Sequence, residues 1–197
     1  WIIIDIVLRG SAWPEERWTW LDARSNHGRA VWRHKMADDT WRLDFQLRPD
    51  EDAEAAATDA AMRQRVWDLL GERVDFDIAW HGVWAYRHEC LDSLRHGRVL
   101  FAGDSAHLVA PFGARGGNGG IQDADNLGWK LALLLQGRAG EPLLDSYSAE
   151  RKHAAMENIR QARRSSRFVY PGPARSATVW RDAIIALAPR HEVSARM

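Results

Sequence analysis

Hydrophobic and polar positions follow β-strand patterns through the first half of the chain. Residues 1–9 form an apolar, β-branched run that predicts a buried strand. Two more strands are predicted at 30–36 and 41–47, and the second alternates apolar and polar side chains, as in a sheet with one packed and one wet face. Asp38 and Asp39 between them are typical turn residues, so we predict an antiparallel hairpin.

A fourth strand is predicted at 77–89, in the same sheet. Its aromatic residues Trp80, Trp84 and Tyr86 fall on one parity. We interpret them as core residues, and the alternative is an aromatic ligand pocket. Residues 98–102 form a short apolar strand that ends at a Gly-Asp pair.

Helical spacing replaces the alternation in several segments. Residues 50–72 are acidic and Ala-rich, with apolar residues at helical spacing before Gly71, which predicts a helix covering the sheet. A further helix is predicted from Gly120 to about residue 136, with Gly137 as its stop and one apolar stripe formed by Ile121, Ala124, Leu127, Leu131 and Leu135. Another helix is predicted over 143–168. A last helical piece is predicted at 179–187, flanked by Pro171, Pro173 and Pro189.

Charge and composition exclude few classes of protein. Lys plus Arg and Asp plus Glu both total 27, so no overall field favours a nucleic-acid partner. Residues 151–197 nevertheless carry ten basic and three acidic side chains. We interpret this tail as a solvated helical face, with a site for a phosphate or an acidic neighbouring domain as the alternative.

The cysteine content and the hydropathy bear on location. The single Cys90 cannot form an internal disulfide and has no metal-ligand companion, so we expect a reducing cytoplasm and no metal. No run approaches the roughly 20 apolar residues that span a bilayer. We therefore expect neither a nucleic-acid partner nor a membrane span.

The segment from Gly103 to Gly120 carries the chemistry. Ten of the 15 glycines lie between 97 and 140, which indicates close approach of backbone to a ligand. A strand ends here, a glycine loop turns and a helix begins, and such a helix start offers unpaired amides and partial positive charge. Asp104 would repel an anion, so it should instead accept hydrogen bonds from hydroxyl groups. A flavin mononucleotide unit combines these hydroxyls with an electron-accepting ring.

A family resemblance covers 84–165 strongly and 1–83 weakly. It is carried by Gly103-Asp104, His107, Pro111, Gly113, Gly116, Asn118, Asp123-Ala124 and Asn126-Leu127. This pattern resembles the second flavin motif of the para-hydroxybenzoate hydroxylase-like aromatic monooxygenases, with the hydroxyphenylpropionate and polyketide hydroxylases nearest. The resemblance implies FAD as cofactor, NADH or NADPH as reductant, and hydroxylation of a small phenolic substrate through a flavin C4a-hydroperoxide.

The resemblance also implies residue roles. Asp104 would bind the ribityl hydroxyls, the amides of Gly117 and Asn118 would face flavin N1 and O2, and the carbonyl of Pro111 would orient the substrate. The remaining cofactor-binding positions would be Gly103, Gly113, Arg115 and Gly116, and for Arg115 a solvent-facing position is equally compatible. His107 is expected to fix the loop, and Asp123 and Asn126 to stabilise the first turns of their helix.

The implied fold is α/β, in part α+β. It consists of a mainly antiparallel substrate-binding sheet domain with a covering helix at 1–96, the C-terminal part of a Rossmann-like FAD-binding domain at 97–168, and a helical extension at 169–197. The chain lacks the GxGxxG motif that holds the pyrophosphate in this family. We therefore expect an N-terminally incomplete enzyme, whose exposed apolar edges are covered by a missing N-terminal half or by self-association.

Two alternatives to the monooxygenase remain open. The first is a catalytically silent fragment or assembly module of the same fold. The second is another flavin-dependent oxidoreductase, because the loop indicates the cofactor and not the substrate.

Overall fold

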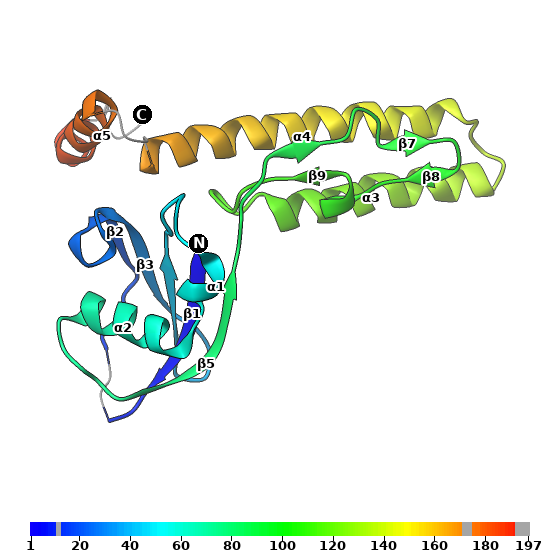
Figure 1. The fold of residues 1–197 in the computed structure, drawn as a ribbon. Helices are drawn as coiled ribbons and strands as arrows, with labels where there is room; N and C mark the ends of the chain where they lie inside the picture. The colour runs from blue at the N-terminus through cyan, green and yellow to red at the C-terminus, as the bar shows by residue number, and fades with distance from the viewer. Residues whose placement is uncertain (11–12, 171–174, 192–197) are drawn as a thin grey trace. The chain divides into compact units, whose positions relative to one another are not determined.

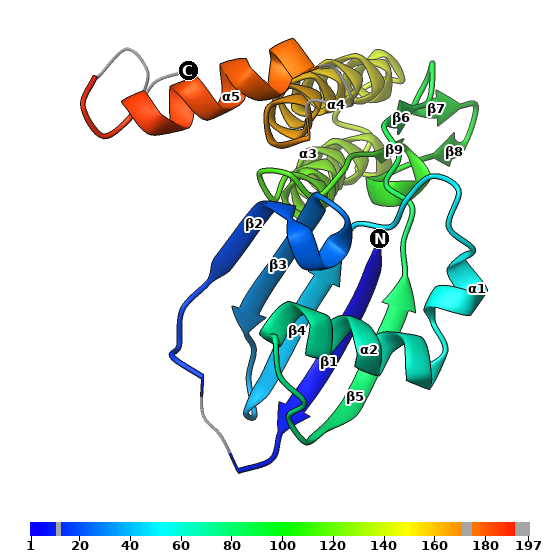
Figure 2. The ribbon, with the colours of Figure 1, turned by 60° about the vertical axis from the view of Figure 1, so that its left-hand side comes forward.

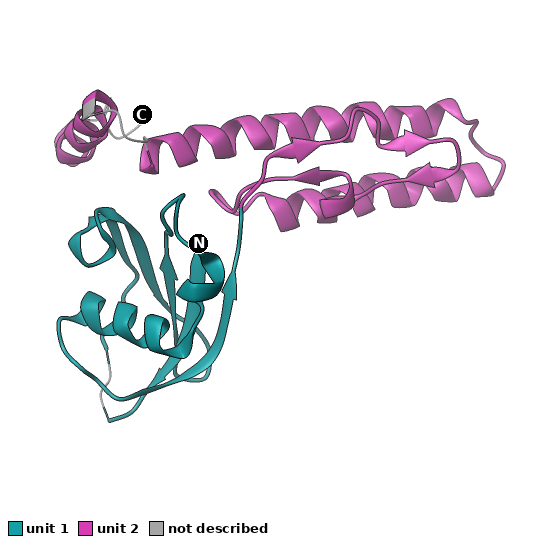
Figure 3. Cartoon of the chain, viewed as in Figure 1, with its two compact units in different colours: residues 1–85 teal, residues 86–197 magenta. Residues whose placement is uncertain are grey.

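The computed structural model describes residues 1–10, 13–170 and 175–191 (Figure 1). It divides into two compact units, residues 1–85 and residues 86–197 (Figure 3). The functional division at 96/97 stays a prediction.

The first unit is built on a five-stranded sheet. Its strands are β1 (Ile2–Leu8), β2 (Trp18–Ala23), β3 (Arg29–Lys35), β4 (Thr40–Phe45) and β5 (Phe76–Val83). Their order is β2-β3-β4-β1-β5, and every pairing is antiparallel. The predicted hairpin is confirmed as β3 and β4, and both aspartates of its turn adopt positive φ angles of 55° and 57°. A short 3-10 helix, η1 (Arg24–Asn26), joins β2 to β3.

One face of this sheet is packed against a helix and forms a hydrophobic core. The short helix α1 (Ala53–Ala56) leads into α2 (Asp59–Leu70), which lies across the sheet (Figure 2). The core combines alternate residues of the strands with two residues of α2; its buried members are Ile2, Ile4, Ile6, Ala23, Val31, Trp41, Leu43, Phe45, Met62, Val66 and Phe76. Thr58 caps the start of α2, and Gly71 ends it in the left-handed conformation that glycine adopts without strain. The predicted covering helix is confirmed.

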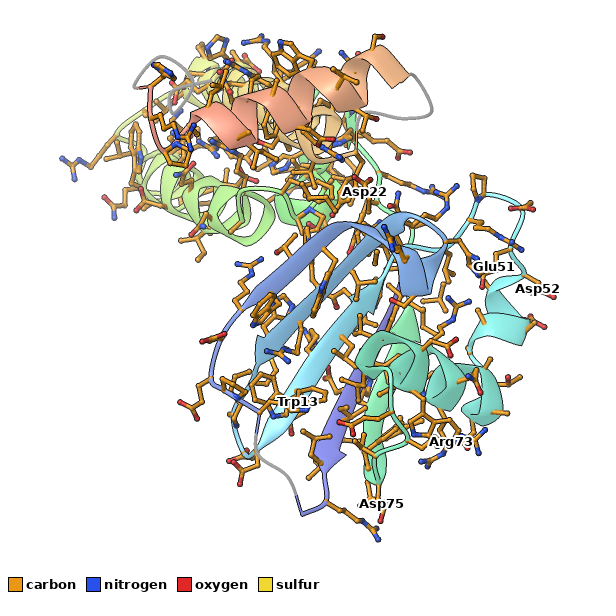
Figure 4. The ribbon with its side chains drawn as sticks, turned by 90° about the vertical axis from the view of Figure 1, so that its left-hand side faces the viewer. Trp13, Asp22, Glu51, Asp52, Arg73 and Asp75 are labelled. Atoms are coloured by element: carbon orange, nitrogen blue, oxygen red, sulfur yellow. The ribbon has the colours of Figure 1, made fainter. Side chains whose placement is uncertain are left out.

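Aromatic and charged side chains extend this core toward the sheet ends. Trp13 lies beside the strands (Figure 4), with its ring 5.2 Å from Trp41 and the Arg33 guanidinium 5.0 Å from its centroid. Arg73 and Asp75, also labelled there, lie in the loop before β5. Arg9 donates to Asp77, the second residue of β5, at 2.6 and 2.8 Å.

The opposite face of the sheet carries ion pairs and aromatic rings. Arg42 makes a bidentate pair with Asp5, both bonds 2.8 Å, and lies 5.9 Å from the Trp80 ring. His34 bonds Asp44 at 3.0 Å on the same face. The interpretation of the aromatic stripe as core is wrong for Trp80 and Trp84, which are 44% and 52% exposed. Alternation along a strand identifies the residues that share one face of the sheet. It does not tell which of the two faces is packed against the rest of the protein.

The second unit is a pair of long helices with short strands beside them. Helix α3 (Gly116–Leu135) and helix α4 (Pro142–Val169) lie side by side in both views (Figures 1 and 2). The strands pair as β6 (Glu89–Cys90) with β9 (His107–Leu108), and β7 (Arg95–His96) with β8 (Val99–Leu100). A short 3-10 turn, η2 (Gly103–Ser105), precedes β9, and α5 (Arg175–Leu187) follows α4.

Three expectations for this unit need correction. Helix α3 begins at Gly116 and not at Gly120, so four of the predicted loop residues form its first turn. The strand predicted at 98–102 is limited to Val99 and Leu100. The apolar stripe of α3 is not a buried one, since Ile121 and Leu135 are 70% and 83% exposed.

Other expectations for this unit are confirmed or fall outside the described residues. Helix α4 matches the predicted span, and Gly137 follows the end of α3 with a φ of 68°. Helix α5 begins four residues before the predicted piece. Pro171 and Pro173 lie outside the described residues. Burial raises the pKa of the Cys90 thiol, which lowers its reactivity.

Candidate functional site

The predicted ligand-binding turn is formed by close packing of two glycines. A Cβ atom placed on Gly120 would lie 3.4 Å from the Cα of Gly103, so η2 rests directly on the first turns of α3. Gly103 has a φ of 58°, a conformation that favours glycine. Its neighbour Asp104 is exposed. The contact therefore brings η2, with Asp104, close to the first turns of α3.

The start of α3 offers free hydrogen-bond donors. Arg115, at the N-cap, provides no side-chain cap, and the first helical bond runs from Gly119 N to Arg115 O. Within the described residues, the amides of Gly116, Gly117 and Asn118 have no acceptor. A Cβ placed on Gly117 would meet nothing within 4 Å. These exposed donors, with the partial positive charge of a helix start, suit an electron-rich ring edge.

The remaining predicted residues surround this turn. Gly113 has a φ of 87°, and the Pro111 carbonyl accepts the Ala114 amide at 2.9 Å, which closes the loop. The Asn118 side chain donates to the Ala114 carbonyl at 2.7 Å and keeps the loop against the helix. Arg115 is partly exposed, and its side chain lies beside Gly113 of the turn while its guanidinium donates to Asn158 of α4 at 3.3 Å.

A buried network of charged side chains supports the turn. The sequence pattern did not predict how many elements this network joins. Asp123 is fully buried and accepts hydrogen bonds from the Gly103 amide at 2.9 Å and from Arg151 Nε at 2.6 Å. His107 Nε2 lies 2.7 Å from the same carboxylate. Arg151 also donates to the Gly119 carbonyl at 3.2 Å. Asp123 therefore joins η2, β9, α3 and α4, which corrects its expected role in its own helix turn.

Asn126 also differs from its expected role. Its amide donates to Glu150 of α4 at 2.9 Å, and Lys130, 1% exposed, bonds the same carboxylate at 2.8 Å. His107 holds the loop, in agreement with its expected role. The sequence does contain a signal for the network: Arg151 occupies the apolar stripe of α4, between Tyr147 and Ala155. A charge at such a position requires a buried partner.

Tyr147 supports the same region from α4. Its side chain is fully buried, and its hydroxyl donates to the Phe101 carbonyl at 2.6 Å, just before Gly103. Burial raises the pKa of Tyr147 to about 12, with a further increase from the charge of Asp123 and an opposing effect of Arg151. The neutral phenol is thus the form that the fold stabilises.

The high pKa of Tyr147 predicts a loss of stability in alkali. The folded value lies above the ordinary value of 10.0, so its contribution is complete below pH 10 and is lost as the pH rises toward 12. The free energy of unfolding of the chain should fall more steeply over this range than that of Tyr147→Phe. Urea unfolding followed by helical circular dichroism at several pH values measures both. Parallel curves would contradict the assignment.

The fold and this turn together define a flavoprotein-type site. An exposed carboxylate for hydroxyl groups, unbonded helix-start amides and open space beside Gly117 all fit the ribityl chain and ring edge of a flavin. The described residues hold no cluster of three possible metal ligands. Within the same residues, no helix has the length and apolarity to cross a membrane.

Comparison with known proteins gives the family. The model described as "FAD binding domain" matches residues 3–162, and the chain belongs to this family. The chain is 38% identical over 147 residues to the 3-(3-hydroxy-phenyl)propionate/3-hydroxycinnamic acid hydroxylase of Mycolicibacterium gilvum, covering 75% of this chain and 26% of that protein. It is 49% identical over 100 residues to a putative polyketide hydroxylase of Streptomyces coelicolor, covering 50% and 16%.

A solved structure supports the fold over nearly the whole chain. The Diels-Alderase PyrE3 of pyrroindomycin biosynthesis superposes with a TM-score of 0.74 at 28% identity, covering 99% of this chain and 42% of PyrE3. The expected family and the mixed α/β fold with an antiparallel sheet are therefore confirmed. The chain spans less than a third of the length of the two hydroxylase relatives.

Proposed function

We propose that this chain forms the flavin-contacting part of an FAD-dependent monooxygenase that hydroxylates a phenolic substrate with NADH or NADPH as reductant. The observation that supports this most strongly is that one turn carries both the exposed Asp104 and the unbonded backbone amides of Gly116, Gly117 and Asn118. When bound, the flavin supplies the electron transfer and the activation of oxygen. The protein supplies position and charge.

Each predicted residue has a defined task in this proposal. Asp104 accepts hydrogen bonds from the ribityl hydroxyls, and the amides of Gly117 and Asn118 donate to the pyrimidine edge of the ring. Negative charge that develops at this edge meets oriented donors that need no rearrangement. Gly103, Gly113 and Gly116 allow the backbone to approach the flavin closely. The Pro111 carbonyl orients the substrate through its second lone pair. Arg115, held by Asn158 of α4 and lying beside Gly113, contacts the flavin or the substrate.

We assign the substrate to the open face of the sheet in the first unit. This face offers the half-exposed Trp80 for an aromatic ring, and the Arg42–Asp5 ion pair and the His34–Asp44 hydrogen bond for polar substituents. Its composition suits a phenol better than an aliphatic acid. We keep the predicted division into a substrate domain at 1–96 and a cofactor domain at 97–168 as part of this proposal.

Asp104→Ala tests the cofactor assignment. We expect the chain to bind FMN, and the substitution to weaken binding roughly 10- to 100-fold, because charged acceptors contribute about 1.5–3 kcal/mol to their hydrogen bonds. Quenching of flavin fluorescence in a titration measures the dissociation constant. Asp125→Ala, an exposed carboxylate of α3, is the matched control and should bind like the unmodified chain. Equal affinity of the two variants, or no binding of FMN by the chain, would refute the proposal.

A silent fragment or assembly module is the second candidate, and the exposed side chains of Ile121 and Leu135 on α3 favour it. They would be covered by further polypeptide of a longer enzyme or by a second copy. The kinship with PyrE3 also allows a flavoprotein with another reaction. A purified chain that has no flavin colour and does not bind added FMN would favour the assembly module. The lone Cys90 supports a cytoplasmic location.

A further inference from the structure

A hollow of about 580 Å³ opens between helices α4 and α5, and the flavin proposal does not use it. This volume lies within the range of roughly 300–1,000 Å³ that is typical of small-ligand sites. Its wall combines apolar and cationic side chains; they are Met156, Ile159, Phe168, Trp180, Arg160, Arg163, Arg164 and Arg167. The hollow shares no residue with the turn at Asp104.

The apolar part of the wall includes two aromatic rings. Phe168 and Trp180 meet edge to face, with centroids 5.8 Å apart and an angle of 78° between the planes. Ile159 forms a buried floor, whereas Trp180 and Met156 stay 50% and 43% exposed. Large apolar side chains that remain exposed in a concave region are typical of binding surfaces.

The cationic part lies on one face of α4. Arg160 and Arg167 each lie three and four residues from Arg163 and Arg164, so these like charges are neighbours on the helix surface and repel one another. Arg160 pairs with Glu157, and Arg163 donates to the His88 carbonyl at 3.4 Å. The side chains of Arg164 and Arg167 have no ion pair or hydrogen bond within the described part of the chain. The helix dipole favours a cation in the last turn, where Arg167 lies, and leaves the earlier arginines unexplained.

We propose that this hollow binds an aromatic anion. The ring of the ligand contacts Trp180 and Phe168, and its acidic group is held by Arg164 and Arg167. Guanidinium groups match carboxylate and phosphate oxygens in a planar, two-bonded geometry, and they tolerate neighbouring like charge when an anion lies between them. The acidic group belongs either to an aromatic carboxylic acid or to a nucleotide phosphate.

Calorimetric titration of the 197-residue chain tests the proposal with four probes. The probes 2-naphthoate and AMP combine a ring with an acidic group, inorganic phosphate has only the charge, and 2-naphthalenemethanol has only the ring. We expect at least one of the two aromatic anions to bind about tenfold more tightly than both single-feature probes. Binding of 2-naphthoate alone would assign a carboxylic acid, and binding of AMP alone a nucleotide.

Substitutions place the binding in this hollow. The double variant Arg164→Gln with Arg167→Gln should weaken the aromatic anion about tenfold or more, since both charged contacts are lost. Trp180→Ala should reduce it to the affinity of inorganic phosphate. Arg138→Gln, an exposed arginine beyond α3, is the matched control and should change nothing. Circular dichroism checks the fold of each variant.

Two results would overturn the proposal. The first is that neither aromatic anion binds the unmodified chain more tightly than the single-feature probes. The second is that the double arginine variant, folded by circular dichroism, binds as tightly as the unmodified chain. Either result would leave the basic stretch of α4 as a solvated face.

Discussion

Asp123→Asn should destabilise the helical unit by about 3–5 kcal/mol, because it leaves the Arg151 guanidinium buried without a counter-ion. The carboxylate also accepts the Gly103 amide and contacts His107, so the turn that carries Asp104 loses its anchor. Urea unfolding followed by helical circular dichroism measures the loss. FMN affinity of the folded fraction should fall with it.

The matched control is Asp125→Asn, which removes the same charge two residues away on an exposed position of α3. Its effect should stay within about 0.5 kcal/mol, as for other surface substitutions. Combining Asp123→Asn with Arg151→Met should recover part of the loss, with a coupling energy of about 1–3 kcal/mol. Additive losses in the double variant would show that the two side chains stabilise the fold independently.

Phe45→Ala should destabilise the first unit by about 3–5 kcal/mol. Phe45 is 1% exposed and lies in the core that the sheet forms with α2, so its removal costs transfer free energy and leaves a cavity. Nine of the 11 tryptophans lie in residues 1–85, and tryptophan fluorescence therefore reports chiefly on this unit during urea unfolding.

Met36→Ala provides the comparison for Phe45→Ala. Met36 follows β3 and is 39% exposed, so its truncation should change the free energy of unfolding by less than about 0.5 kcal/mol. Similar losses for the two variants would mean that the sheet and α2 do not form a tightly packed core. Tyr147→Phe and Asp104→Ala are the corresponding test variants for the second unit.

Local pattern predicted most of the elements, because neighbouring residues determine them. The alternation in 41–47 predicted β4, the aspartates at 38 and 39 predicted its turn, and Gly71 predicted the end of α2. The start of α3 was predicted four residues late, since Gly116, Gly117 and Gly119 have low helix propensity. Packing of Gly103 against Gly120 outweighs that propensity.

The sequence by itself determined the order of the elements and the FAD-binding family, because these depend on short-range spacing and on a contiguous motif. The flavin-contacting residues of the turn remain a prediction from the same motif. Tertiary structure alone decided that Asp123 supports the turn, that Trp80 faces outward and that the arginines of α4 line a hollow with Trp180. Asp123 and Arg151 are 28 residues apart, and Arg164 and Trp180 are 16 apart. Contacts over such separations depend on how helices and strands pack, which no local pattern contains.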